Sequence, residues 1–477
     1  MSRNDALALA AQYYDSGEFF ADLARRVACP TESQNPQRAQ ELQDYLRREI
    51  GLSLENMGFE LRQVDNAQAG KPPLLLARRI EDAALPTVLM YGHGDVVNGQ
   101  EGRWQQDRSP WALSHEGDKC YGRGTADNKG QHSINLGALA ATLKARAGKL
   151  GVNLKMIFEM SEEIGSPGLL EACTGHAEFL RADLFLASDG PRLAAGRPTV
   201  FLGSRGALQF RLTLDPQNGA HHAGNWGGVL LNPAMVLAHA AASLVSADGV
   251  IQVAGLRPPP VTPRVRQLVS DFSVGADAGD PALAAGWGEP GLTPAERLFA
   301  WNTLEMIAFE AGNAARPVGA IPAIAQAVFQ LRFVVGTDWE NAEQHLRRHL
   351  DAGGFHSVQL SFEGSAPATR LDPDDPWVAF ATASMQTSSG KPVSVLPNLG
   401  GTIPNHCFSE ALGLPTIWVP HSYPSCSQHA PDEHLLGSVA REGLQLMAGL
   451  LWDLGEQGDA VRRQRSQHGQ RQPGRPD

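Results

Sequence analysis

The chain has 477 residues, of which 42% are hydrophobic and 19% are charged, and its formal net charge is −11 at pH 7. This length exceeds one ordinary hydrophobic core, so several domains are expected, and the composition is typical of a globular protein. The acidic balance argues against nucleic acid as the main partner, and no apolar run is long enough to cross a membrane.

Cysteine usage and the N-terminal segment both favour a cytoplasmic protein. The cysteines are few, odd in number and without a C-x-x-C pair, which disfavours a disulfide framework or a cysteine-only zinc site. They are Cys29, Cys120, Cys173, Cys407 and Cys426. The N-terminal segment carries Asp5, Asp15 and Glu18, and it predicts an amphipathic helix rather than a signal peptide.

Residues 1–201 alternate between helix and strand patterns. Apolar side chains at helical spacing predict a helix over residues 35–51, closed by Gly51, and a second helix over 132–148. Short apolar runs that predict buried strands lie at 86–95, 152–160 and 182–188. This alternation indicates an α/β domain with a mostly parallel sheet that helices cover on both faces.

From residue 202 the pattern changes to alternating, half-buried strands combined with helices. These elements are predicted at 207–215, 232–245, 325–335 and 339–354. Helix and buried-strand patterns return after residue 370. The simplest arrangement is one α/β domain, made of residues 1–201 and 371–455, that is interrupted by an inserted α+β domain of residues 202–370.

The composition of two further segments predicts that they are exposed to solvent. Residues 274–295 are rich in glycine, alanine and proline, which predicts an exposed insertion. Residues 456–477 contain five arginines and almost no apolar side chains, so we expect a disordered tail. Binding of acidic partners is the alternative role for this arginine-rich tail.

Several residues of metal-binding type follow the predicted strands or lie in glycine-rich loops. They are His93, Asp95, Asp127, Glu162, Glu163, Asp189 and His429. Hydrolytic metal sites need imidazole and carboxylate ligands and a base for the attacking water, and functional residues collect at the carboxyl ends of parallel strands. Each residue alone also fits a turn former or a solvated charge. Their joint occurrence favours a metal site.

Five motifs that contain these residues resemble those of one known enzyme family. In chain order they read H-G-D, G-R-G-x-x-D-N-K-G, S-E-E-I-G-S, S-D-G and H-A-P-D-E. They resemble the cocatalytic metallopeptidase family of carnosinase-like dipeptidases, aminoacylases, acetylornithine deacetylase and glutamate carboxypeptidase. The resemblance covers most of the chain and implies a hydrolase that cleaves an amide or peptide bond in a small substrate.

The resemblance also implies two divalent metal ions and assigns their ligands. His93 and Asp189 would bind one ion, His429 and Glu163 the other, and Asp127 would bridge the two. In the family the peptide bond after the bridging aspartate is cis. Imidazole and carboxylate ligands suit zinc best, with manganese and cobalt as alternatives.

Two more acidic residues receive roles in the reaction from this resemblance. Asp95 would hold the ring of His93 in place, in contrast to a solvated aspartate at a strand end. Glu162 would act as general base, taking a proton from the water that the two ions acidify and then passing one to the leaving amine. The alternative for Glu162 is support of the neighbouring ligands.

The inserted domain would serve as a lid and as the surface through which a homodimer forms. By register, His222 matches the residue that reaches into the partner subunit's active site and polarises the substrate carbonyl; the alternative is an exposed loop residue. Arg332 and Thr402 match positions near the substrate carboxylate, with a salt bridge and a tight turn as the alternatives. Asn313 is a weaker candidate for a carbonyl contact.

Within the family, an aspartate at position 189 is typical of dipeptidases and aminopeptidases, so a cytoplasmic dipeptidase is the leading hypothesis. An N-acyl-amino-acid deacylase or a carboxypeptidase is the alternative. A non-catalytic binding protein on the same fold is a remote one, because all five ligands and the base are present. A serine or cysteine nucleophile would need a motif such as G-x-S-x-G with triad partners, which the sequence lacks.

Overall fold

The largest sheet has eight strands in the order β1-β2-β6-β3-β7-β16-β8-β15. Its strands are β1 (Glu60–Val64), β2 (Leu74–Arg79), β6 (Asn153–Glu159), β3 (Thr87–His93), β7 (Leu184–Ala187), β16 (Thr416–Trp418), β8 (Thr199–Phe201) and β15 (Ser394–Leu396). This computed structural model describes residues 1–217, 219–275 and 280–470. The four neighbouring strands β6, β3, β7 and β16 pair in parallel, and so do β8 and β15. The other pairs of neighbouring strands are antiparallel. The predicted mostly parallel sheet is confirmed.

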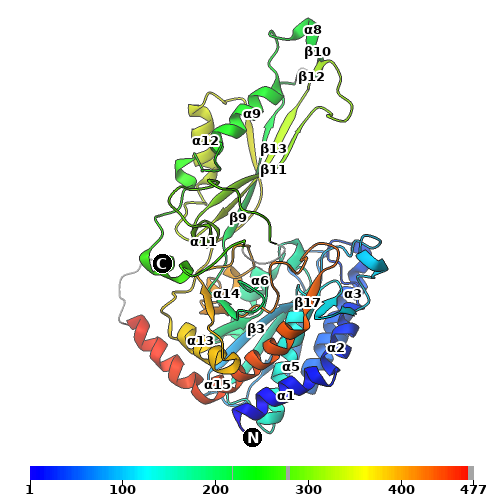
Figure 1. Cartoon of the computed structure of the whole chain (residues 1–477), viewed down its shortest axis with the longest axis vertical. Coiled ribbons are helices and arrows are strands. Elements are labelled where there is room, and N and C mark those ends of the chain that lie inside the picture. The colour runs from blue at the N-terminus through cyan, green and yellow to red at the C-terminus, as the bar shows by residue number, and fades with distance from the viewer. Residues whose placement is uncertain (218, 276–279, 471–477) are drawn as a thin grey trace.

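Helices cover both faces of this sheet (Figure 1). Successive residues of β3 point to opposite faces, because Val88 and Met90 pack in one hydrophobic core while Leu89 and Tyr91 pack in another. The first core is covered by α1 (Arg3–Asp15), α2 (Glu18–Val27), α5 (Lys129–Ala145), α13 (Pro376–Ser389) and α15 (Gly437–Gln470). The second is covered by α6 (Leu169–Gly175) and α14 (His406–Ser409).

The helix predicted over residues 35–51 does not end at Gly51. It runs as α3 (Ala39–Asp44), a π-helical segment (Tyr45–Gly51) and α4 (Leu52–Asn56). Gly51 has helical dihedral angles, with φ −57° and ψ −54°. A Cβ there would lie 3.1 Å from the carbonyl oxygen of Leu46, so close packing explains this glycine and not termination of the helix.

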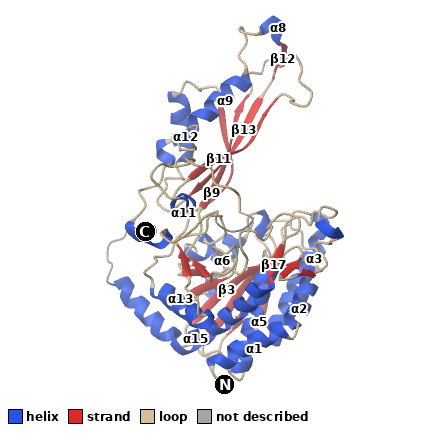
Figure 2. Cartoon of the chain, viewed as in Figure 1, coloured by secondary structure: helices blue, strands red, loops and turns tan. Residues whose placement is uncertain are grey.

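A second, four-stranded antiparallel sheet has the order β11-β13-β9-β14 and projects from the body of the molecule (Figure 2). Its elements are β9 (Gly206–Leu214), β11 (Thr303–Ala311), β13 (Ala325–Phe333) and β14 (Gln359–Ala366), with α9 (Pro233–Leu244) and α12 (Ala342–Ala352) packed in the same core. The far end carries β10 (His221–His222), α8 (Ala223–Trp226) and β12 (Ala320–Ile321). We call residues 206–366 the arm, and its α+β character confirms the prediction.

The prediction of a disordered tail is wrong for residues 456–470, which continue α15. Val461 is buried in the core, and Arg465 pairs with Asp375 at the start of α13. Residues 471–477 lie outside the described part of the chain. Within the predicted exposed insertion of residues 274–295, residues 281–287 are exposed, whereas Ala295 is buried and residues 276–279 lie outside the described part of the chain.

The remaining elements are short. They are β4 (Ser114–Glu116), β5 (Lys119–Tyr121) and β17 (His434–Leu436), which form a small sheet, the helices α7 (Ala177–Leu180), α10 (Pro263–Val269) and α11 (Pro294–Ala300), and 3-10 turns at 36–38, 105–107, 162–164 and 254–256. Among the described residues, no helix combines the length and apolar character needed to cross a membrane.

Candidate metal centre

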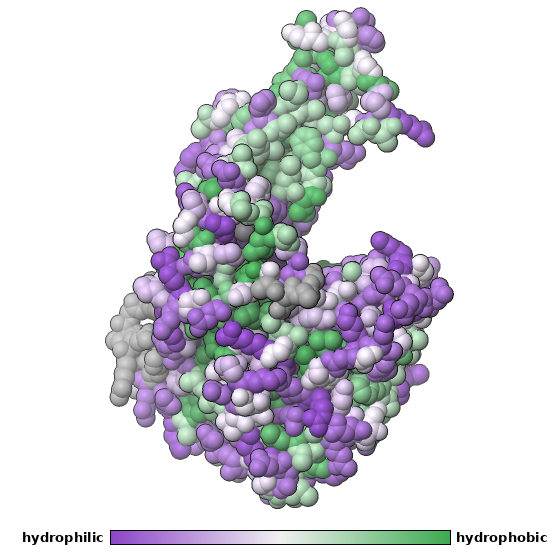
Figure 3. All heavy atoms as spheres, viewed as in Figure 1, coloured by the Kyte–Doolittle hydropathy of each residue, from purple (hydrophilic) through white to green (hydrophobic). Residues whose placement is uncertain are grey.

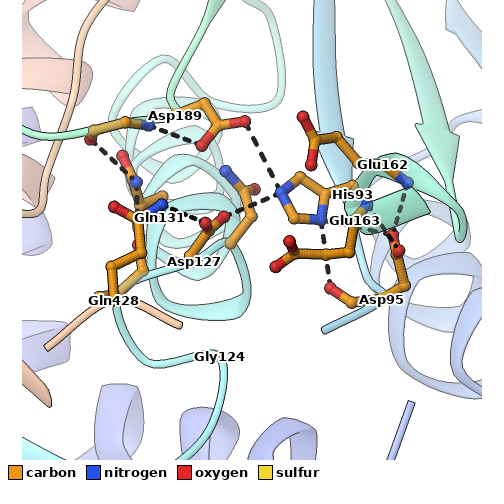
Figure 4. Close-up of polar contacts among 12 residues, drawn as sticks. His93, Asp95, Gly124, Asp127, Gln131, Glu162, Glu163, Asp189 and Gln428 are labelled. Atoms are coloured by element: carbon orange, nitrogen blue, oxygen red, sulfur yellow. Dashed lines mark hydrogen bonds and ion pairs between the residues drawn. The ribbon is translucent and has the colours of Figure 1, made fainter. Parts of the chain in front are cut away.

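Three neighbouring parallel strands bring the predicted ligands to one edge of the large sheet. His93 is the last residue of β3, Glu162 and Glu163 lie in the 3-10 turn after β6, and Asp189 follows β7. Because β6, β3 and β7 are adjacent and parallel, their carboxyl ends meet at the same edge. Figure 4 shows the carboxylates of Asp127 and Asp189 beside the ring of His93, with Glu162 and Glu163 nearby.

The loop that carries Asp127 is held by Glu433. The Glu433 carboxylate accepts backbone N–H bonds from Gly124 at 3.1 Å, Ala126 at 2.9 Å and Asp127 at 3.1 Å. It also accepts a bond from Arg123 Nη1 at 2.8 Å, and both side chains are buried. The peptide bond after Asp127 is cis, as the resemblance implied. Glu433 therefore fixes the direction in which the Asp127 carboxylate points.

Sequence reasoning gave no role to Glu433 or to Gln428, whose Nε2 donates to Asp127 Oδ2. Glu433 stands in the H-A-P-D-E motif, so its place in that motif was the available signal. The sequence signal for Gln428 is weaker, because this residue only precedes the predicted ligand His429.

Replacing Glu433 by glutamine is expected to lower the free energy of unfolding by about 3 kcal/mol, because Arg123 would be left buried without its charged partner. Denaturant unfolding of purified protein measures this change. Glu60→Gln is the matched control: its ion pair with Arg78 is exposed, so less than about 1 kcal/mol is expected. Equal effects of the two substitutions would contradict the role of Glu433.

Two groups of three side chains could each hold a metal ion, and they share Asp127. In the first, His93 Nε2 lies 3.0 Å from Asp127 Oδ1 and 3.6 Å from Asp189 Oδ2. In the second, His429 Nε2 lies 3.1 Å from Asp127 Oδ2 and 3.1 Å from Glu163 Oε2. The structure thus brings the five predicted ligands together in the two predicted sets, while their binding of metal stays a prediction.

The charges of this cluster fit divalent cations. Burial, with the nearby charge of Asp127, raises the pKa of Glu163 to about 7 and that of Asp189 to about 6. Hydrogen bonds to Asp127 and Glu163 raise the pKa of His429 to about 11. Glu163 Oε1 is buried and has no hydrogen-bond partner among the described residues. In the metal-free protein, protons thus balance the carboxylates, and cations would displace them on binding.

Asp95 supports the cluster mainly through the backbone of its neighbours. Its carboxylate accepts N–H bonds from Glu162 at 3.1 Å and from Glu163 at 3.1 Å, which fixes the 3-10 turn that carries both side chains. His93 Nδ1 lies 3.1 Å from the backbone carbonyl oxygen of Asp95 and 3.4 Å from its carboxylate. Asp95 therefore lies beside His93 and fixes the backbone of the adjacent glutamates, while its role in orienting the His93 ring stays a prediction.

A cavity of about 620 Å³ opens beside the cluster. Asp127, Asp189 and Glu162 line one part of it, and Glu162 belongs to neither of the two ligand groups. Burial and the neighbouring negative charges raise the pKa of Glu162 well above its usual range. Arg332 and Thr402 line another part, where Arg332 Nη1 donates to Thr402 Oγ1 at 2.5 Å. The cavity is therefore lined on one part by the carboxylate of Glu162, which belongs to neither ligand group, and on another part by the cationic side chain of Arg332.

His222 and Asn313 lie in the arm and do not line this cavity. Strand β10, which carries His222, is at the end of the arm farthest from the large sheet (Figure 1). His222 is exposed, and its Nδ1 accepts the N–H of Gly224 at 3.1 Å. Asn313 Oδ1 accepts the N–H groups of Ala315 at 3.0 Å and Arg316 at 3.2 Å. Within one chain, neither residue is brought to the metal cluster.

An imidazole–carboxylate cluster at the carboxyl edge of a parallel sheet, beside a cavity with a spare carboxylate, defines a metal-dependent hydrolase. The model of Peptidase family M20/M25/M40 matches residues 89–453. The chain belongs to this family, which confirms the resemblance drawn from the motifs.

Known relatives align with most of this chain. The Beta-Ala-His dipeptidase of Mus musculus is 26% identical over 438 residues, which cover 86% of this chain and 86% of the relative. The Cys-Gly metallodipeptidase of Schizosaccharomyces pombe is 28% identical over 350 residues, which cover 70% and 72%. The solved structure of the dipeptidase Dug1p from Saccharomyces cerevisiae matches with a TM-score of 0.79 at 24% identity, covering 96% and 99%. This last likeness shows the shared fold.

Proposed function

We propose that this peptide-bond hydrolase is a dipeptidase that works with two divalent metal ions, of which zinc is favoured over manganese or cobalt. The observation that carries the proposal is the pair of ligand groups sharing Asp127, with Glu162 beside them in the cavity. The relatives described above are dipeptidases by name. The cavity volume suits a small substrate.

In this proposal the side chains divide into ligands and a base. His93 and Asp189 would hold one ion and His429 and Glu163 the other, with Asp127 as the ligand common to both groups. Two divalent ions bound there would supply Lewis acidity to the scissile carbonyl and to the attacking water. Glu162 accepts the proton of that water and delivers a proton to the leaving amine. Its place in the cavity, outside both ligand groups, supports this role.

The other part of the cavity binds the end of the substrate. The guanidinium of Arg332 offers hydrogen bonds to a terminal carboxylate, and the hydroxyl of Thr402, which accepts from Arg332 Nη1, holds that guanidinium at this place in the cavity. A dipeptide and an N-acyl amino acid share that carboxylate, so an N-acyl-amino-acid deacylase or a carboxypeptidase remains the alternative. The names of the relatives favour the dipeptidase.

We further propose that residues 1–201 and 371–455 form the catalytic domain of a cytoplasmic homodimer that pairs through the inserted domain of residues 202–370. Green patches lie along the arm in Figure 3. Its exposed apolar side chains include Trp226, Val229, Met235, Met306, Ile307, Phe309, Val318 and Ile324. Apolar surface of this extent is typical of a protein–protein interface. Asn313 and His222 would then face the partner subunit.

Metal analysis combined with a substrate panel tests the proposed function. We expect about two metal equivalents per chain, because each ligand group is built for one ion. The panel compares dipeptides, N-acyl amino acids and longer peptides, and dipeptides should have the highest kcat/KM. Preference for N-acyl amino acids would identify a deacylase. Protein that binds no divalent metal and hydrolyses none of these substrates would overturn the proposal.

A further inference from the structure

One wall of the cavity beside the metal cluster is built from apolar side chains. Three segments that are distant in the sequence supply it: the predicted insertion of residues 274–295, helix α11, and the glycine-rich loop after β15. The six side chains are Val274, Leu283, Leu298, Phe299, Leu399 and Ile403, and we call them the apolar wall. Sites for small molecules are mostly apolar, with a few polar groups that fix the orientation of the ligand. The wall is therefore suited to an apolar part of the substrate.

The insertion reaches the cavity because the chain before it is anchored on the second hydrophobic core. Phe272 packs edge-on against Phe299, with ring centroids 6.0 Å apart. Val274 is partly buried against the same core. Leu283 packs over Gly275, where a Cβ would lie 2.9 Å from Leu283 Cδ2, and 50% of the Leu283 surface stays exposed. The insertion thus adds Val274 and Leu283 to the lining of the cavity.

The apolar wall adjoins the part of the cavity that is proposed to bind the terminal carboxylate. Leu298 lies against Gly400, where a Cβ would be 3.3 Å from Leu298 Cδ1. Gly400 is two residues before Thr402, whose hydroxyl accepts from Arg332 Nη1. In the C-terminal residue of a peptide, the carboxylate and the side chain branch from the same Cα atom. A carboxylate held by Arg332 therefore places that side chain within reach of the wall.

We propose that the apolar wall receives the side chain of the C-terminal residue of the substrate, so that the enzyme prefers dipeptides that end in a large apolar residue such as leucine or phenylalanine. This inference rests on the proposed function. Removal of apolar surface from water favours binding in proportion to the area that is buried. A C-terminal glycine would leave the wall uncovered, and a charged side chain would lose its hydration there.

The test compares kcat/KM of the metal-loaded enzyme for Ala-Leu, Ala-Gly and Ala-Lys. The value for Ala-Leu should exceed that for Ala-Gly by about 10- to 100-fold, the range expected when a leucine side chain is buried on binding. Asp280 also lines the cavity and could attract a basic side chain. A preference for Ala-Lys over Ala-Leu, or equal values for Ala-Leu and Ala-Gly, would overturn the inference.

Leu298→Ala should lower the ratio of kcat/KM between Ala-Leu and Ala-Gly by about tenfold, because part of the apolar contact is deleted. Leu412→Ala is the matched control, since Leu412 is also partly buried against the second core but does not line the cavity. Its ratio should equal that of the wild type. If Leu298→Ala lowers both values equally, Leu298 only supports the fold and the inference fails.

The same variant distinguishes the two ends of the substrate. The apolar wall could instead contact the side chain of the N-terminal residue, which Leu-Gly and Ala-Gly compare. If Leu298→Ala lowers the ratio between Leu-Gly and Ala-Gly and leaves the ratio between Ala-Leu and Ala-Gly unchanged, the wall receives the N-terminal side chain and the inference is wrong.

Leu283→Asp gives a second test should the Leu298 variant not fold. Leu283 is 50% exposed, so a polar side chain is tolerated there, and Leu52, which is 53% exposed and does not line the cavity, supplies the control Leu52→Asp. Leu283→Asp should lower the ratio between Ala-Leu and Ala-Gly by about fivefold. An unchanged ratio would overturn the inference. A wild-type enzyme that hydrolyses no dipeptide would instead refute the proposed function, so the two failures are distinguishable.

Discussion

Glu162→Gln is expected to lower kcat by about a thousandfold while the metal content stays unchanged. Glutamine keeps the volume of the side chain but cannot accept a proton from water. Glu162 lines the cavity and belongs to neither ligand group, so its replacement leaves both sets of ligands complete. Steady-state kinetics and metal analysis of the same preparation measure the two quantities.

The adjacent residue supplies the matched control. Glu163 lies 3.1 Å from His429 in the second ligand group, so Glu163→Gln should lower the metal content as well as activity. Both side chains start from the turn that Asp95 holds, which makes the backbone perturbation similar. Full activity of Glu162→Gln would contradict its assignment as the base. If Glu162→Gln loses metal and Glu163→Gln keeps it, Glu162 is the metal ligand and Glu163 is the base.

The large sheet and the positions of the metal-binding residues could be predicted because both depend on local sequence. Short apolar runs gave β3, β6 and β7, and the residues that follow parallel strands meet at one edge whatever the details of packing. His93, Glu163 and Asp189 needed only the order of these strands to come together. Asp127 and His429 needed the family motifs, because their loops have no periodic pattern.

Features that depend on contacts between distant segments could not be predicted. Glu433 acts on Gly124 and Asp127, which lie about three hundred residues earlier in the chain. The few apolar side chains of residues 456–477 predict disorder. In the structure, the helix that continues to residue 470 contacts the body through an ion pair between Arg465 and Asp375.

His222→Ala is expected to lower kcat by about a hundredfold or more with unchanged metal content, because one donor to the developing oxyanion would be lost. His222 Nδ1 accepts the N–H of Gly224, so in the neutral ring the proton lies on Nε2. In the proposed homodimer, that N–H would donate to the carbonyl of a substrate bound in the partner subunit. His221→Ala is the adjacent control and should have a much smaller effect on kcat.

Mixing two inactive variants distinguishes a shared site from a local one. In a mixed dimer of His222→Ala and Glu162→Gln, one active site combines an intact Glu162 with the intact His222 of the other subunit. Random subunit exchange makes half of the dimers mixed, so recovery of roughly a quarter of wild-type activity is expected. A chain that carries both substitutions should restore neither variant on mixing, because every active site in such a mixture lacks either Glu162 or His222. If subunit exchange is verified and the mixture still recovers no activity, His222 does not act across the interface. His222 is then an exposed residue at the end of the arm without a role in catalysis.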